Sequence, residues 1–412
     1  MKTWQKITII LLILALIGIL VFLYFYGAST TNPDDPDGVQ NPVFPFEPPV
    51  GDDGDDFFSG DSGDPSDDDE ENDPEEKDRL WRVSDRPVAG SGWVTREDGS
   101  QAIWYVLKEN GHVYEHDIEN RASTRLTNTT IPRVQEAIIS PNGEHVIYRY
   151  IDIESRNIKT FLATTERTPD GETLYSIDGS FLPDNLTEVN LSPDGNRIFS
   201  FQNTTDGVIG VLYNITTDEG EVFFDSPLQE WRSEWNHSDL ITIFTKPAAG
   251  VTGVAYQLNT TSGEKTKIID GSALTASLHP SNQYLLTGKQ ESGSYRSRLY
   301  EMDDLTSNVM SPATLVEKCN WSDDELFCGI PNNLPNKPLK DWYQGKINFS
   351  DQLVSFHLAT RNQDRIFTEE ELNKGPFDII KISPANNTEH LIFTNHRNND
   401  LWAIDLENDQ EN

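Results

Sequence analysis

The sequence predicts an all-β fold, a seven-bladed β-propeller, over residues 80–412. Three observations lead to this prediction: a turn motif that repeats along that region, short alternating strands on either side of each copy, and a composition that suits strands. Aromatic residues make up 10% of the chain while apolar residues reach only 36%. That balance fits many half-buried strands better than a helical bundle.

The first predicted element is a membrane anchor at residues 7–26, a run of twenty residues without a charged side chain. As a helix rising about 1.5 Å per residue, it would span the roughly 30 Å hydrocarbon core of a bilayer. Lys2 and Lys6 precede the run and acidic residues follow it, so the positive-inside rule places residues 1–6 in the cytoplasm and the rest outside. A cleaved signal peptide is the alternative, although its apolar core would be long and the cleavage site weak.

The second predicted element is a disordered, acidic, proline-rich linker at residues 27–79. Between Ala28 and Arg79, nineteen acidic residues stand against two basic ones. Such charge with little apolar content cannot offset the entropy lost on ordering, so we expect an extended stalk. The aspartate clusters lack the spacing of a calcium-binding loop, which favours solvated charge. The net charge of −36 for the whole chain argues against nucleic acid as a partner.

The third element is the repeat itself, whose copies lie 42 to 62 residues apart between positions 141 and 384. Two clear copies are Ser140-Pro141-Asn142-Gly143 and Ser192-Pro193-Asp194-Gly195, each between an apolar segment and an alternating one. Proline presets φ for a turn, asparagine or aspartate bonds its own backbone, and glycine takes positive φ. Further copies near 236, 280, 322 and 384, with an N-terminal unit at 102–118, predict seven blades of about four strands. Six or eight blades are also compatible with this pattern.

The last unit looks incomplete, because residues 391–394 and 401–406 supply only two strands. Two early segments, residues 80–83 and 92–95, are available to complete it. Sharing one blade between the two ends of the domain would remove an exposed sheet edge, so we expect such a shared terminal blade.

The repeat, an apolar segment followed by Ser-Pro-Asp-Gly and an alternating strand, resembles the TolB-like propeller repeat, a relative of the WD repeat. The resemblance covers residues 80–412. The order of anchor, acidic stalk and propeller is also similar to a group of uncharacterised, membrane-anchored bacterial proteins from small-genome candidate lineages, through segments such as 88–92, 127–133 and 342–345. The resemblance implies the propeller fold and transfers no activity and no site residues.

No catalytic motif emerges from the sequence. The G-x-S-x-G elbow of hydrolases that accompany some propellers does not occur, and the protease-like Gly60-Asp61-Ser62-Gly63-Asp64 lies in the predicted linker. Eight histidines are scattered, so we expect neither a metal site nor a cofactor. Cys319 and Cys328 could form a disulfide in an oxidising compartment, or stay as buried thiols on neighbouring blades.

The repeated turns form the candidate binding surface, since recognition often lies on loops carried by a rigid scaffold. We expect them to join the outer strand of one blade to the inner strand of the next and to surround one mouth of the channel. The candidate residues are Asn142, Asp194, His237, Ser281, Asp323 and Asn386. Plain turn formation is the alternative role for them. An insertion at 330–350 carries Trp342 and Tyr343, which could contact a partner or pack over a blade.

These observations together predict a monomeric, membrane-tethered, extracytoplasmic propeller that binds or scaffolds and is not an enzyme. Its expected partner is a protein, peptide or glycan of the cell envelope or the exterior. An extracellular glycan hydrolase or lyase with carboxylates at the propeller axis is the alternative function. A purely structural spacer of the envelope is a third.

Overall fold

The computed structural model describes residues 77–96, 98–167, 175–184 and 186–406. The predicted anchor at 7–26 lies outside these residues, as do the cytoplasmic tail and nearly all of the predicted linker, so these remain predictions. Within the described residues, no helix is long and apolar enough to cross a membrane.

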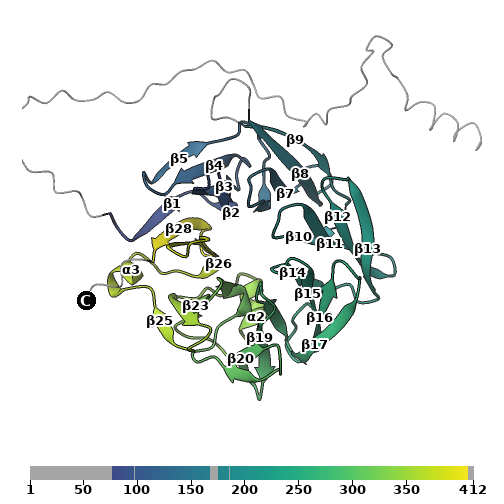
Figure 1. Cartoon of the computed structure of the whole chain (residues 1–412), viewed down its shortest axis with the longest axis vertical. Coiled ribbons are helices and arrows are strands. Elements are labelled where there is room, and N and C mark those ends of the chain that lie inside the picture. The colour runs from purple at the N-terminus through teal and green to yellow at the C-terminus, as the bar shows by residue number, and fades with distance from the viewer. Residues whose placement is uncertain (1–76, 97, 168–174, 185, 407–412) are drawn as a thin grey trace, which may run out of the picture. The chain divides into compact units, whose positions relative to one another are not determined.

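The described residues form seven four-stranded antiparallel sheets around a central axis (Figure 1). This confirms the predicted all-β, seven-bladed propeller. The chain builds each complete blade from the axis outward, so the first strand of each blade is the innermost.

The strands follow the blades in order. The first three complete blades are β2 (Val88–Thr95), β3 (Gln101–Leu107), β4 (Val113–Asp117) and β5 (Ala122–Arg125); β6 (Val134–Ile139), β7 (His145–Ile151), β8 (Ile158–Arg167) and β9 (Tyr175–Phe181); and β10 (Leu186–Leu191), β11 (Arg197–Thr204), β12 (Gly207–Asn214) and β13 (Glu219–Ser226). The next three are β14 (Trp231–Glu234), β15 (Leu240–Thr245), β16 (Thr252–Asn259) and β17 (Lys265–Ser272); β18 (Thr275–Leu278), β19 (Tyr284–Glu291), β20 (Ser294–Glu301) and β21 (Ser307–Val309); and β22 (Cys319–Trp321), β23 (Glu325–Pro331), β24 (Asp351–His357) and β25 (Gln363–Arg365). Three short helices accompany them: η1 (Val316–Lys318), α2 (Pro338–Tyr343) and α3 (Glu369–Asn373).

The terminal blade joins the two ends of the domain, as expected. Its three inner strands are β26 (Ile379–Pro384), β27 (His390–Asn395) and β28 (Asp400–Asp405), and β1 (Leu80–Ser84) pairs with β28 as the outermost strand. The sequence analysis undercounted this blade, because β26 belongs to it. The segment 92–95 is not part of the closure, since it lies in β2 at the axis of the first blade.

The turn between β6 and β7 shows why the repeated motif folds as it does. The Ser140 hydroxyl donates to Asn142 Oδ1 over 2.7 Å, and the His145 amide donates to Ser140 Oγ over 2.9 Å. Gly143 has a φ of 70°, a left-handed conformation that glycine adopts without strain. The turn after β10 repeats these contacts.

The position of these turns differs from the expectation. Each joins the innermost strand of a blade to the second strand of the same blade, whereas we had expected it to connect two blades. Because antiparallel strands alternate in direction, these turns lie at one end of the channel, here termed the turn mouth. The loops that lead from one blade into the next innermost strand lie at the other end, the loop mouth.

The core consists of apolar layers between neighbouring blades. One layer packs Trp81 and Leu401 of the terminal blade against Trp93 and Ile103 of the first complete blade. Another joins Phe199 and its neighbours in the third complete blade to Trp231 and Ile243 of the fourth, around a set of edge-on aromatic rings. These layers bury the apolar halves of the strands, which is the main stabilising term for such a fold.

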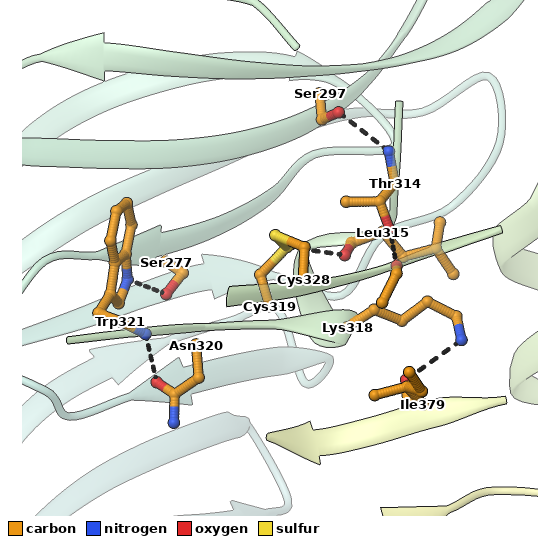
Figure 2. The surroundings of a disulfide bond; sticks show 11 residues. Ser277, Ser297, Thr314, Leu315, Lys318, Cys319, Asn320, Trp321, Cys328 and Ile379 are labelled. Carbon is orange, nitrogen blue, oxygen red and sulfur yellow. Dashed lines mark hydrogen bonds between the residues drawn. A yellow bond between two sulfur atoms is a disulfide. The ribbon is translucent and has the colours of Figure 1, made fainter. Parts of the chain in front are cut away.

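Cys319 and Cys328 form a disulfide between β22 and β23 of one blade, at directly opposed positions (Figure 2). The structure therefore confirms the disulfide and contradicts the alternative of free thiols on neighbouring blades. Lys318 precedes this bridge in the chain, and its side chain extends towards the Ile379 carbonyl in the terminal blade.

Candidate functional site

A cavity of about 380 Å³ extends from the loop mouth into the channel. Residues of the innermost strands β10, β14, β18 and β26 line it, together with η1 and α2. Charged side chains on these short strands lie among the lining residues. The titratable lining residues are Glu188, Arg232, Glu234, Glu317, Tyr343, Lys381 and His396.

Four of these groups are paired with each other in the cavity wall. Arg232 forms an ion pair with Glu188 across β14 and β10. The Tyr343 hydroxyl donates a hydrogen bond to Glu317 Oε1. Burial and the neighbouring Glu317 carboxylate raise the pKa of Tyr343 well above its ordinary value, so Tyr343 stays protonated and keeps donating.

Two carboxylate oxygens in the cavity wall have no partner. Oε2 of Glu234 and Oε2 of Glu317 are both shielded from bulk solvent and accept no hydrogen bond. Burial raises the pKa of Glu234 to about 7 and also raises the pKa of Glu317. A buried polar atom without a partner costs roughly 1–3 kcal/mol, so these two oxygens mark where a ligand would gain most.

The segment between β23 and β24 carries α2 and lies at the loop mouth. Trp342 is buried with 5% of its surface exposed, while Tyr343 is 39% exposed, and both line the cavity. Of the two rings that the sequence analysis considered, only Trp342 is buried against the blade. Tyr343 presents an aromatic surface to the channel.

A buried ion cluster holds this segment in place. The Lys318 ammonium donates to Asp351 Oδ2 over 2.6 Å and to Asp378, and all three side chains are fully buried. The Trp342 indole donates to Asp378 Oδ2 over 3.2 Å, which ties α2 to the terminal blade. The Lys318 ammonium also lies 5.4 Å from the Trp342 ring centroid, a cation–π distance.

The two carboxylates of this cluster differ in their protonation behaviour. Burial raises the pKa of Asp351 to about 6. Burial also opposes the ionisation of Asp378, but hydrogen bonds from His396 and Lys318 outweigh it and lower the pKa of Asp378. One ammonium between two carboxylates thus favours a charged Asp378 beside a readily protonated Asp351.

The residues predicted as a binding ring lie at the turn mouth, away from this cavity, and form turns. Asn142 accepts from Ser140, Asp194 accepts from Ser192, His237 accepts from the Asp239 amide, and Ser281 bonds His279. Their polar groups therefore satisfy the local backbone, which supports the turn-forming role.

Asp323 and Asn386 are brought together by the structure. Both line a second cavity of about 570 Å³ at the turn mouth, between β22–β25 and the terminal blade. Trp342 and Tyr343, by contrast, belong to the loop mouth.

The sequence analysis missed the charged lining of the channel. Glu188 and Glu136 each stand four residues before the serine of a repeated turn, inside an apolar strand. A charged residue within the short apolar segment before a repeated turn is the sequence signal that could have predicted a charged channel lining. Glu317 gives no such signal, because it lies in η1, outside the repeat pattern.

Within the described ranges, no group of three or more histidine, cysteine, aspartate or glutamate side chains is arranged to hold a metal ion. The two cavities described above, at the loop mouth and at the turn mouth, are therefore considered as sites for ligands other than a metal ion.

Comparison with known proteins supports the fold and no more. No protein-family model matches the chain, and no curated protein matches it. Among solved structures, an oligogalacturonate lyase from Vibrio parahaemolyticus aligns with a TM-score of 0.54 at 10% identity, over 81% of this chain and 94% of the lyase. The β-propeller domain of the Trilobed protease from Pyrococcus furiosus aligns with a TM-score of 0.50 at 12% identity, over 79% of this chain and 96% of that domain. TolB from Acinetobacter baumannii aligns with a TM-score of 0.42 at 11% identity, over 68% and 63%.

Proposed function

We propose that this protein is a binding module that takes a ligand in the channel at the loop mouth, beneath the segment that carries α2. The observation that supports this most is the cavity itself. It is concave, partly aromatic, and contains two buried carboxylate oxygens without partners. Clefts with a few convergent polar groups are the usual ligand sites of proteins.

We further propose that the propeller works outside the cell as a monomer, held by the anchor at 7–26 and spaced from the membrane by the acidic linker. The disulfide supports an oxidising compartment, where such bonds persist. The similarity to uncharacterised membrane-anchored propeller proteins also favours this arrangement. The partner would then be an envelope or extracellular protein, peptide or glycan.

Photo-crosslinking from inside the cavity tests the binding function. The full chain, carrying p-benzoyl-phenylalanine in place of Tyr343, would be irradiated in the cells that make it naturally and analysed by mass spectrometry. We expect an adduct of defined mass at this position. The control places the same group at Asn386, at the turn mouth. Equal adducts at both positions, or none at 343, would contradict a ligand site at the loop mouth.

A glycan hydrolase or lyase is the second candidate, because three carboxylates line one cavity and the pKa of Glu234 is raised by burial to about 7. A general acid or base works best when its pKa is near the working pH. An uncharged glycan would suit this site better than an oligogalacturonate, since a polyanion would be repelled by the acidic wall. Incubating the full chain with neutral polysaccharides and measuring new reducing ends tests this. Activity that survives Glu234→Gln would exclude this role for Glu234.

A further inference from the structure

We propose that the group bound in the channel cavity is an organic cation, an ammonium or guanidinium, held by Glu234 and Glu317 beside the Tyr343 ring. This inference rests on the proposed binding function and specifies the chemical class of its ligand.

The first argument is the kind of atom that lacks a partner. The unpartnered, solvent-shielded atoms in this wall, Glu234 Oε2 and Glu317 Oε2, are both acceptors when ionised. In the ionised form, only a hydrogen-bond donor can satisfy them. A charged donor forms the shorter and stronger bond to a carboxylate, roughly twice the strength of a neutral pair.

The second argument is the balance of charge in the cavity. Arg232 is paired with Glu188, so that pair contributes little net charge. What remains is Glu234 and Glu317 against Lys381, with His396 alongside. Lys381 already donates to the Ala89 carbonyl over 3.3 Å. When both glutamates are ionised, their two negative charges therefore exceed the one positive charge of Lys381.

The third argument is the aromatic surface. Tyr343 is half exposed to the channel and its hydroxyl is fixed by Glu317, so its ring is held in place next to a carboxylate. A cation near such a ring is attracted by the ring electrons in addition to its hydrogen bonds. Directly behind this wall, the fold places its own ammonium, Lys318, near the Trp342 and Phe349 rings. The cavity wall thus combines carboxylates with an aromatic ring, as the chain does around Lys318 in its interior.

The fourth point is a pH dependence that distinguishes a cation from a neutral ligand. Burial raises the pKa of Glu234 to about 7, against the hydrogen bonds that it accepts from Ser277, Asn236 and the Leu278 amide, and Glu317 is the charged group beside it. Below that pH Glu234 takes up a proton and no longer attracts a cation. The affinity for a cation should therefore fall by up to about tenfold per pH unit below 7 and level off above it. A neutral ligand, which gains nothing from the charge, would lack this slope.

The experiment compares matched probes by calorimetry on the full chain in detergent. Pentylammonium is compared with pentan-1-ol, which has the same chain and no charge. Acetyl-Gly-Lys-Gly-amide is compared with the same peptide carrying acetyl-lysine, to separate a free amine from a peptide side chain. We expect the charged member of at least one pair to bind at pH 8 at least tenfold more tightly than its neutral partner, and to weaken at pH 6.

The variants Glu234→Gln and Glu317→Gln should each reduce cation binding about tenfold or more, while thermal unfolding confirms that each variant folds. The matched control is Glu325→Gln, a partly buried glutamate with a burial-raised pKa at the turn mouth, which should bind as the wild type does.

Equal binding of pentylammonium and pentan-1-ol, or unchanged binding in both cavity variants, would overturn the inference. An adduct at position 343 without any binding of either cation would overturn the inference alone and leave the binding function standing.

Discussion

Replacing Lys318 by methionine tests whether the buried ion cluster stabilises the fold around the segment that carries α2. The substitution keeps the length of the side chain and removes the ammonium that Asp351 and Asp378 share. Both carboxylates have side chains with no exposed surface, so neither can recover its lost partner from water. Removing one partner of a buried pair typically costs about 3–5 kcal/mol. We expect Lys318→Met to lose at least that much, measured by urea unfolding at pH 8.

The pH dependence of this loss of unfolding free energy provides a second, independent test. In Lys318→Met the two carboxylates have no ammonium between them, so the folded-state pKa of Asp351 rises further above its unfolded value and that of Asp378 rises from its lowered value. A group with a raised folded-state pKa destabilises the protein as the pH rises through that pKa. The loss should therefore be smaller at pH 5 than at pH 8.

The control is Lys159→Met, which breaks the partly exposed Lys159–Asp184 pair and should cost less than about 1 kcal/mol. A Lys318→Met protein within 1 kcal/mol of the wild type at pH 8 would refute the argument.

The remaining predictions concern stability. Burial raises the pKa of Asp351 to about 6, so ionisation of this carboxyl lowers the free energy of unfolding of the wild type as the pH rises from 4 to 7. Asp351→Asn removes this loss, so its free energy of unfolding relative to the wild type should increase by about 2 kcal/mol over that range, measured by urea unfolding at both pH values. Gly90→Ala should destabilise by about 1–3 kcal/mol or more in thermal unfolding, since its Cβ would lie 1.9 Å from the Ala137 carbonyl oxygen of the next blade. Replacing Cys319 and Cys328 together by alanine should cost about 2–3 kcal/mol, the loop-entropy term for a separation of 9 residues. Mass spectrometry should show a gain of about two hydrogens when the wild type is reduced.

Controls separate these effects from general sensitivity. Gly220→Ala, whose Cβ would meet its nearest neighbour at an ordinary 3.4 Å, should be neutral or slightly stabilising. If it destabilised as strongly as Gly90→Ala, steric contact between β2 and β6 would not be the cause. An Asp351→Asn protein whose gain did not change with pH would contradict the role given to burial of that carboxylate.

The fold was predictable from the sequence because its information is local and repeated. Ser140, Asn142 and Gly143 form their turn from contacts within a few residues, and each copy of the motif carries the same chemistry. The closing strand β1 was predictable for a different reason, namely that an incomplete last blade needs an edge partner. Its exact boundary against β2 was not, since both segments have strand-like sequences.

The candidate site was much less predictable. Glu188, Arg232 and Glu317 come from different parts of the chain and meet only when the blades close. Asn142 and Asp194 were identified because they occupy the same position in successive copies of the motif. That position is defined by the turn, so its repetition predicts turns and gives no information on a ligand site. A ligand site breaks the repeat, because each blade contributes a different side chain at the axis. The insertion at 330–350 was predictable from the sequence, and its Trp342 lines the cavity.

The pairing of β1 with β28 has a consequence for how the chain is made. β1 is synthesised before any complete blade, yet among the described strands it pairs with the one that ends at Asp405. Throughout elongation the ring stays open, with one unpaired strand at the front and a growing stack of blades behind it. Late, long-range pairing of this kind slows folding and exposes strand edges to other chains. Nascent chains that stall before residue 400 should therefore be the ones that need a chaperone.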